Sequence, residues 1–144
     1  MSAKSAGGED RLPVRIPQGY ITRMAASDPR GNLASLTQRV LRHRDERDWG
    51  QFHTPKELAI SLAVEATELL SLMQWKTGEQ LAQAVADKRE KIVDELADVL
   101  HSTLLLAADL KIDLAEALEQ KLQKDAKKYP VEKAKGKNLK YDEL

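Results

Sequence analysis

The sequence predicts an all-α fold, a helical bundle of four principal helices, and three observations support this class. From Leu33 onward, apolar residues recur at intervals of three and four, as they do on one face of an α-helix. No stretch alternates apolar and polar residues in the way that a half-buried strand does. Helix start and stop signals occur where the periodic segments begin and end. A chain of 144 residues is long enough for one domain with a buried core.

The chain is expected to divide into a tail, a helical domain and a second tail. Residues 1–32 mix Gly, Pro, Ser and charged residues without a sustained period, which predicts a flexible N-terminal tail. Residues 33–130 carry the helical periodicity and form the predicted domain. Residues 131–144 form a lysine-rich C-terminal tail, which we also expect to be flexible.

The first two helices are placed by periodicity and by a capping pattern. The first is predicted from Leu33 to Arg47. In the second, Thr54 is expected to cap the first turn, Pro55 to take the first helical position and Glu57 to answer the cap. This helix should end near Trp75, before a Lys-Thr-Gly sequence.

The remaining helices follow in the same way. Asp87 is expected to cap the third principal helix, which reaches about Asp109. Residues 79–86 should form a short helix in the connection that precedes it. The last helix is predicted from Asp113 to Lys128, with a proline two residues later that stops it. We expect the second and third principal helices to pack antiparallel.

Four acidic residues lie on or beside the apolar stripes of these two antiparallel helices. At 100° per residue, Glu65 falls in the middle of its stripe and Glu68 on the edge. Glu95 and Asp98 lie beside the stripe of the third helix. Residues at one level of an antiparallel pair have a constant index sum, and both pairings, 65 with 98 and 68 with 95, give 163. Half of this sum is the sequence midpoint between the paired residues, and it coincides with the centre of the predicted connection between the two helices. The four carboxylates are therefore expected to meet at one level.

Four carboxylates at one level repel one another unless protons or cations neutralise them. Ligation by oxygen atoms alone suits a hard ion, Mg²⁺ or Mn²⁺. The alternative is that these are ordinary surface acids on amphipathic helices, the commoner fate of a lone Glu-x-x-Glu pattern. The position of Glu65 in mid-stripe and the matched register favour a metal site.

Composition excludes several classes of protein. The chain has no cysteine, which excludes disulfides and thiolate metal sites and favours an intracellular setting. No apolar run approaches the roughly 20 residues of a membrane span, so we expect a cytoplasmic protein without membrane contact. The net charge is zero, but acids concentrate in the middle of the chain and bases at both ends. This distribution suits a cation and a phosphate ligand, and it does not suit nucleic acid, which needs a broad basic face.

The sequence resembles the MazG-like nucleoside triphosphate pyrophosphohydrolases, and within them the branch related to dCTP pyrophosphatase. The resemblance covers about residues 36–141 and is carried, in order, by ERDWGQFHTPKEL, EATELLSLMQWK, DELADVL and KLQKDAKKYP. It implies hydrolysis of a nucleoside triphosphate to the monophosphate and pyrophosphate with Mg²⁺, by a homodimer or homotetramer. It also implies that the metal ligands and catalytic residues are Glu65, Glu68, Glu95 and Asp98.

The same resemblance implies residues that bind substrate. The candidates for the nucleobase are Trp49, Phe52, His53 and Trp75, and those for phosphate are Lys121, Lys128 and Tyr129. Alternatives are open for both sets, because the aromatic residues could simply close the ends of a helix and the lysines could line a solvated helix terminus. Asp125 departs from the family, which commonly has asparagine there, and an anion would repel phosphate.

Substrate and reaction class are less constrained than the fold. Because the sequence resembles the dCTP pyrophosphatase branch, the substrate that we expect first is dCTP or a modified pyrimidine deoxynucleotide. A di-iron carboxylate bundle is a rival, but it needs Glu-x-x-His on two helices, and only Asp98 with His101 approaches that pattern. The second rival is a non-catalytic helical module for oligomerisation or regulation. The sequence also leaves open which carboxylate is the general base and how many metal ions bind.

Overall fold

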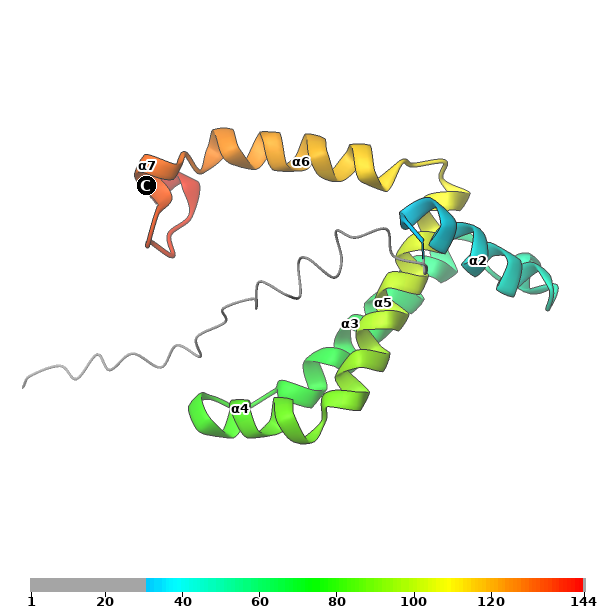
Figure 1. The fold of residues 1–144 in the computed structure, drawn as a ribbon, viewed down its shortest axis with the longest axis horizontal. Helices are drawn as coiled ribbons and strands as arrows, with labels where there is room; N and C mark the ends of the chain where they lie inside the picture. The colour runs from blue at the N-terminus through cyan, green and yellow to red at the C-terminus, as the bar shows by residue number, and fades with distance from the viewer. Residues whose placement is uncertain (1–30, 144) are drawn as a thin grey trace, which may run out of the picture. The chain divides into compact units, whose positions relative to one another are not determined.

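A computed structural model describes residues 31–143 of the chain, and the secondary structure of these residues is helical without a strand (Figure 1). This confirms the all-α class. The chain forms two compact units, of which the first ends at Leu106 and the second begins at Ala107. Within the described range, no helix has both the length and the apolar character that a membrane span requires.

The first described helix, α2, spans Leu33–Asp45 and begins where the periodicity predicts. The Asn32 side chain caps it by accepting a hydrogen bond from the Ser35 backbone N–H at 3.0 Å. The helix ends two residues before the predicted boundary, because the chain turns and Asp48 adopts a left-handed φ of 53°. A single 3₁₀ turn, η1 (Trp49–Gln51), follows. The predicted N-terminal tail lies outside the described residues except at positions 31 and 32.

Helix α3 (Pro55–Met73) begins as predicted. Thr54 is its N-cap, and the threonine hydroxyl accepts a hydrogen bond from the Glu57 N–H at 3.3 Å. Proline in the first position needs no hydrogen-bond partner for its nitrogen, so it fits without cost. The helix ends at Met73, and Trp75 takes a left-handed φ of 64° that redirects the chain into α4 (Gly78–Asp87), the predicted short helix.

Helix α5 spans Arg89–Asp109, but its predicted cap at Asp87 is wrong. Asp87 is the last residue of α4, and its carboxylate accepts a hydrogen bond from the Gln83 side chain at 2.7 Å. Because only Lys88 separates α4 from α5, the backbone at Asp87 stays helical. It therefore cannot adopt the extended conformation that an N-cap requires.

Helices α3 and α5 run side by side and antiparallel, with α4 joining their ends (Figure 1). The residues buried most deeply in the first unit are Leu58 near the start of α3, and Leu104 and Leu105 near the end of α5. The positions of Leu58 and Leu105 add up to 163, the same index sum as those of Glu65 and Asp98, as expected for residues at one level of an antiparallel pair.

The second unit contains the last turn of α5 and helix α6 (Leu114–Lys128). Helix α6 begins where the sequence predicts, and the Asp113 carboxylate caps it by accepting hydrogen bonds from the N–H groups of Ala115 at 2.9 Å and Glu116 at 3.1 Å. After Pro130 the predicted C-terminal tail includes two short helical segments, α7 (Val131–Ala134) and η2 (Tyr141–Glu143).

Candidate functional site

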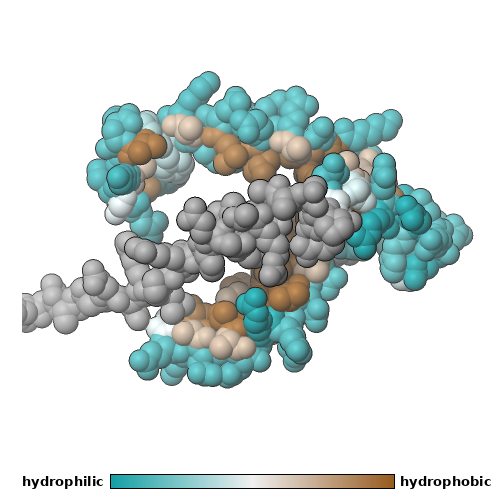
Figure 2. Space-filling model, viewed as in Figure 1, coloured by the Kyte–Doolittle hydropathy of each residue, from teal (hydrophilic) through white to brown (hydrophobic). Residues whose placement is uncertain are grey.

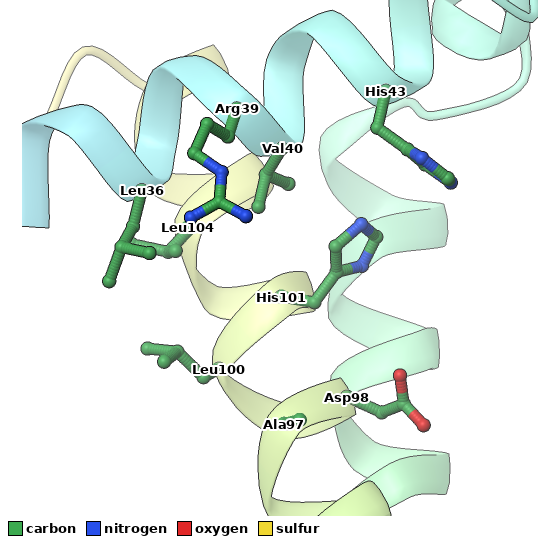
Figure 3. Close-up of a pocket in the computed structure, with 9 residues that line it drawn as sticks. All are labelled: Leu36, Arg39, Val40, His43, Ala97, Asp98, Leu100, His101 and Leu104. Carbon is green, nitrogen blue, oxygen red and sulfur yellow. The ribbon is translucent and has the colours of Figure 1, made fainter. Parts of the chain in front are cut away.

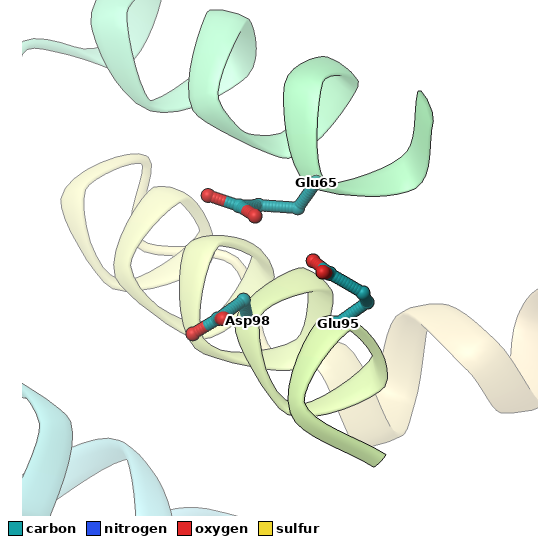
Figure 4. Close-up of side chains that lie close together, drawn as sticks. All are labelled: Glu65, Glu95 and Asp98. Atoms are coloured by element: carbon teal, nitrogen blue, oxygen red, sulfur yellow. The ribbon is translucent and has the colours of Figure 1, made fainter. Parts of the chain in front are cut away.

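Three carboxylates from two helices form a compact acidic cluster. Glu65 comes from α3, and Glu95 and Asp98 come from α5 one turn apart (Figure 4). One oxygen of each carboxylate lies within 4.8 Å of the others. Figure 4 shows the Glu65 side chain directed across the helix interface toward the other two. The antiparallel register of α3 and α5 brings these residues to one level, as the index sum predicts.

Glu68, the fourth predicted acid, joins the cluster at its edge. It lies one turn after Glu65 on the same helix and is exposed to solvent. The charge of Glu68 contributes to the raised pKa values of Glu65 and Glu95, so its side chain lies near both. The structure therefore brings all four predicted acids together, with three in a tight group and Glu68 beside them.

The electrostatics of the cluster are those of crowded like charges. Partial burial raises the pKa of Glu65, and the charges of Asp98, Glu68 and Glu95 raise it further. Loss of solvation also raises the pKa of Glu95, followed by the charges of Glu68 and Asp98. Raised pKa values mean that the ionised cluster is destabilised and gains free energy by binding protons or a cation. An all-oxygen donor set of this kind fits a hard divalent metal ion.

The predicted base-binding residues fall into two groups. Trp49 and His53 lie together, with ring centroids 6.2 Å apart, and the Arg47 guanidinium lies 5.6 Å from the centre of the Trp49 ring. Phe52 is 63% exposed and Trp75 is 90% exposed. Trp49 precedes α3 and Trp75 follows it, and the 19 residues of this helix span about 28 Å. A single nucleobase is much shorter than this helix.

The predicted phosphate-binding residues all belong to the second unit. Lys121 pairs with Asp125 one turn away on α6, so the unexpected anion at position 125 has a cationic partner on its own helix. The Lys128 ammonium lies 5.2 Å from the centre of the Tyr141 ring. Tyr129 meets the same ring edge-on at 6.2 Å. Two of the three candidates, Lys128 and Tyr129, therefore contact the ring of Tyr141. The role of all three in binding phosphate stays a prediction.

A pocket of about 520 Å³ between α2 and α5 contains residues that the sequence did not single out (Figure 3). Asp98 of the acidic cluster lies at its edge, and His101 follows one helical turn later. His43 and Arg39 come from α2. Burial lowers the pKa of His101, the nearby His43 and His53 lower it further, and Asp98 opposes them. The i, i+3 spacing of Asp98 and His101 is the one sequence signal for this pocket.

Comparison with known proteins identifies relatives over most of the chain. The family model described as "MazG-like family" matches residues 60–144. Human dCTP pyrophosphatase 1 is 41% identical over 141 residues, which cover 96% of this chain and 83% of that protein. Bovine dCTP pyrophosphatase 1 is 38% identical over 101 residues, or 69% of this chain and 60% of the bovine protein's length.

The fold is also found among solved structures. The crystal structure of a pyrophosphatase from Archaeoglobus fulgidus superposes with a TM-score of 0.65 at 33% sequence identity. The match covers 68% of this chain and 92% of the archaeal chain.

Proposed function

Because this chain belongs to the MazG-like family, we propose that it is a nucleoside triphosphate pyrophosphohydrolase. The reaction adds water across the bond between the α and β phosphates and yields a nucleoside monophosphate and pyrophosphate. The observation that carries the proposal is the acidic cluster, which places three carboxylate oxygens within 4.8 Å of one another on the paired helices.

The donor set fits Mg²⁺, or Mn²⁺ as the nearest alternative. Glu65, Glu95 and Asp98 supply hard oxygen ligands from α3 and α5, and Glu68 lies beside this group on α3. When bound, a divalent ion neutralises charge on the phosphates and lowers the pKa of a coordinated water. The raised pKa values of Glu65 and Glu95 support this role, because desolvated like charges are stabilised when a cation binds among them.

The carboxylates also provide the proton acceptor that hydrolysis needs. An attacking water must lose a proton, and a carboxylate that is not fully engaged as a ligand can accept it. Glu68 suits this task best, because it is exposed and lies outside the group of three.

The substrate that we propose is dCTP or a modified pyrimidine deoxynucleoside triphosphate. Support comes from the mammalian relatives named dCTP pyrophosphatase 1. Trp49 and His53 are adjacent and provide one aromatic face and one hydrogen-bonding ring for a base. Lys121, Lys128 and Tyr129 remain the proposed contacts to phosphate.

We further propose that the protein is a homodimer or homotetramer. Six apolar residues of α3 and α5 are each 43% to 58% exposed to solvent. They are Ile60, Val64, Leu70, Val93, Leu96 and Leu100. The α6 helix also presents hydrophobic surface, which appears brown in Figure 2. Contiguous patches of exposed apolar side chains mark protein interfaces. Within one chain the length of α3 separates Trp75 from Trp49, so a second copy would be needed to bring both to one base.

A screen for pyrophosphate release tests the function. Purified protein with Mg²⁺ is given each standard deoxynucleoside and ribonucleoside triphosphate, together with 5-methyl-dCTP. We expect pyrophosphate release with the highest kcat/KM for a pyrimidine deoxynucleotide. A purine or ribonucleotide that leads by more than tenfold would overturn the substrate and leave the reaction standing. Absence of turnover, together with thermal stability that does not respond to Mg²⁺, would favour the non-catalytic helical module.

A further inference from the structure

The segment that follows α6 reverses direction and brings an aromatic ring back to the end of that helix (Figure 1). Pro130 is the N-cap of α7, and Gly136, just after α7, has a left-handed φ of 76°. Residues with a side chain rarely adopt such a φ, so this glycine permits the turn. The η2 turn then begins at Tyr141, and the Lys140 N–H donates a hydrogen bond to the Glu143 carboxylate at 3.2 Å. Tyr141 is therefore held in a defined turn.

The Tyr141 ring contacts two consecutive residues at the end of α6. Lys128 is the last residue of this helix, and Tyr129 is its C-cap. The Lys128 ammonium lies 5.2 Å from the centre of the Tyr141 ring, within the range of a cation–π interaction. The Tyr129 ring meets the Tyr141 ring edge-on, with centroids 6.2 Å apart and planes at 90°, an arrangement that aromatic pairs prefer. Tyr129 therefore supports the ring that Lys128 contacts.

Lys128 differs from its neighbouring lysines in what surrounds its charge. Lys121, another proposed phosphate contact, pairs with Asp125. The second ammonium near the Tyr141 ring belongs to Lys140, 5.8 Å from the ring centre, and it pairs with Asp142 at 3.4 Å. In the described part of the chain, no ion pair with a carboxylate involves Lys128. A cation–π contact orients an ammonium and leaves its N–H donors available to an anion.

We propose that Tyr141 is a positioning residue for phosphate binding, because its ring holds the Lys128 ammonium in place before the substrate arrives. The inference rests on the proposed function, in which Lys128 contacts the triphosphate. A lysine side chain loses rotational freedom when it binds a ligand, and a side chain that is already ordered loses less. The attraction of an ammonium to an exposed ring corresponds to about two- to fivefold in an equilibrium constant. The ring should strengthen phosphate binding by a factor of this size.

Isothermal titration calorimetry of pyrophosphate in the presence of Mg²⁺ measures this factor. Tyr141→Leu removes the aromatic face and keeps apolar bulk, and we expect it to bind pyrophosphate about threefold more weakly than the wild type. Tyr141→Phe keeps the ring and should bind within about 1.5-fold of the wild type. Val131→Ala, at a 74% exposed position of the same unit, is the matched control and should equal the wild type. In a Lys128→Gln background, Tyr141→Leu should have no further effect, because its action passes through Lys128.

NMR spectroscopy tests the position of Lys128 without ligand or turnover. The lysines are dimethylated with ¹³C-formaldehyde, which retains their charge. The Lys128 methyl signal is identified by its absence from Lys128→Gln. The ring current of Tyr141 should move this signal upfield in the wild type, and the ring of Tyr141→Phe should do the same. In Tyr141→Leu the signal should coincide with those of exposed lysines.

The outcomes distinguish this inference from the proposed function. Equal pyrophosphate binding by the wild type and Tyr141→Leu, or an unshifted Lys128 signal in the wild type, would overturn the inference even in a protein that hydrolyses triphosphates. A loss of binding that persists in the Lys128→Gln background would also overturn it, because Tyr141 would then act through another group. If circular dichroism shows that Tyr141→Leu is unfolded, Tyr141→Met is measured in its place. The expected binding and signal shift in a protein that releases no pyrophosphate from any triphosphate would sink the proposed function and retain the role of Tyr141.

Discussion

Replacing Glu65 by glutamine is expected to stabilise the metal-free protein and to weaken its response to Mg²⁺. Glu65 is the one member of the acidic cluster on α3 within the group of three, and it faces Glu95 and Asp98 on α5. Glutamine keeps the shape of the side chain and removes its charge. The repulsion that raises the pKa of Glu65 is thereby lost, while one metal ligand becomes a weaker neutral oxygen.

The size of the effect follows from the separation of the charges. Two unit charges 4.8 Å apart repel by about 0.9 kcal/mol in bulk water. The water value is the appropriate one because Glu65 is only partly buried. An unfolding entropy of about 2.1 cal/mol/K per residue converts the repulsion from Asp98 alone into a Tm increase of about 3 °C for a chain of this length. Salt screens exposed charges, so the increase should shrink at about 1 M NaCl.

The second quantity to measure is the increase in Tm when Mg²⁺ is added. A ligand present at 100 times its Kd stabilises the folded state by about 2.7 kcal/mol, or roughly 9 °C in Tm on the same conversion. The wild type should show a shift of this order with saturating Mg²⁺, and Glu65→Gln should show less than a third of it at the same concentration. Differential scanning fluorimetry with and without Mg²⁺ measures both quantities.

Asp94→Asn is the matched control for this experiment. It removes an acid from α5 next to Glu95 but outside the group of three carboxylates. It should therefore keep the full Mg²⁺ shift. The reasoning is refuted if Glu65→Gln lowers the metal-free Tm and still responds to Mg²⁺ as the wild type does.

Three further results are expected to separate stability from activity. The pKa values of Glu65 and Glu95 are raised, so protons bind the folded state more tightly than the unfolded one, and the metal-free Tm should rise as the pH falls toward the ordinary carboxyl value of 4.5. The Tm advantage of Glu65→Gln should shrink over the same interval, and a constant difference would count against the electrostatic cause. Thr54→Ala removes the cap of α3 and should cost about 1 kcal/mol, or about 3 °C in Tm, with KM unchanged; an unaltered Tm would show that the cap is dispensable. Trp75→Ala should leave Tm within about 1 °C, because the side chain is 90% exposed, and should reduce kcat/KM about tenfold if the indole stacks on the base; equal kcat/KM would remove Trp75 from the site.

Local chemistry and helical geometry explain why much of the fold could be predicted from the sequence. The cap at Thr54 and the start of the last helix at Asp113 depend on short-range patterns, and both occur as predicted. The constant index sum that places Glu65 opposite Asp98 requires only two straight antiparallel helices, and the structure brings these residues together. Asp87 failed as a cap because a neighbouring helix continued through it, which its own sequence pattern does not reveal.

The pocket between α2 and α5 was harder to predict for a physical reason. His43 and His101 are 58 positions apart, and neither forms a motif with its neighbours apart from the spacing of His101 from Asp98. Their proximity depends on how α2 packs against α5, which the periodicity of each helix does not specify. The separation of Trp49 and Trp75 differs from this case, because it follows from the length of α3 alone. Both flank α3 in sequence, and only the length of the folded helix separates their positions.

The most direct test of the central claim is to identify the products of dCTP by ³¹P NMR in the presence of Mg²⁺. The account predicts that the wild type and Asp94→Asn convert dCTP to dCMP and pyrophosphate, while Asp98→Asn loses turnover by at least a hundredfold and remains folded by circular dichroism. Orthophosphate with dCDP would show that another bond is cleaved. Full activity in Asp98→Asn would contradict the assignment of the acidic cluster as the catalytic metal site.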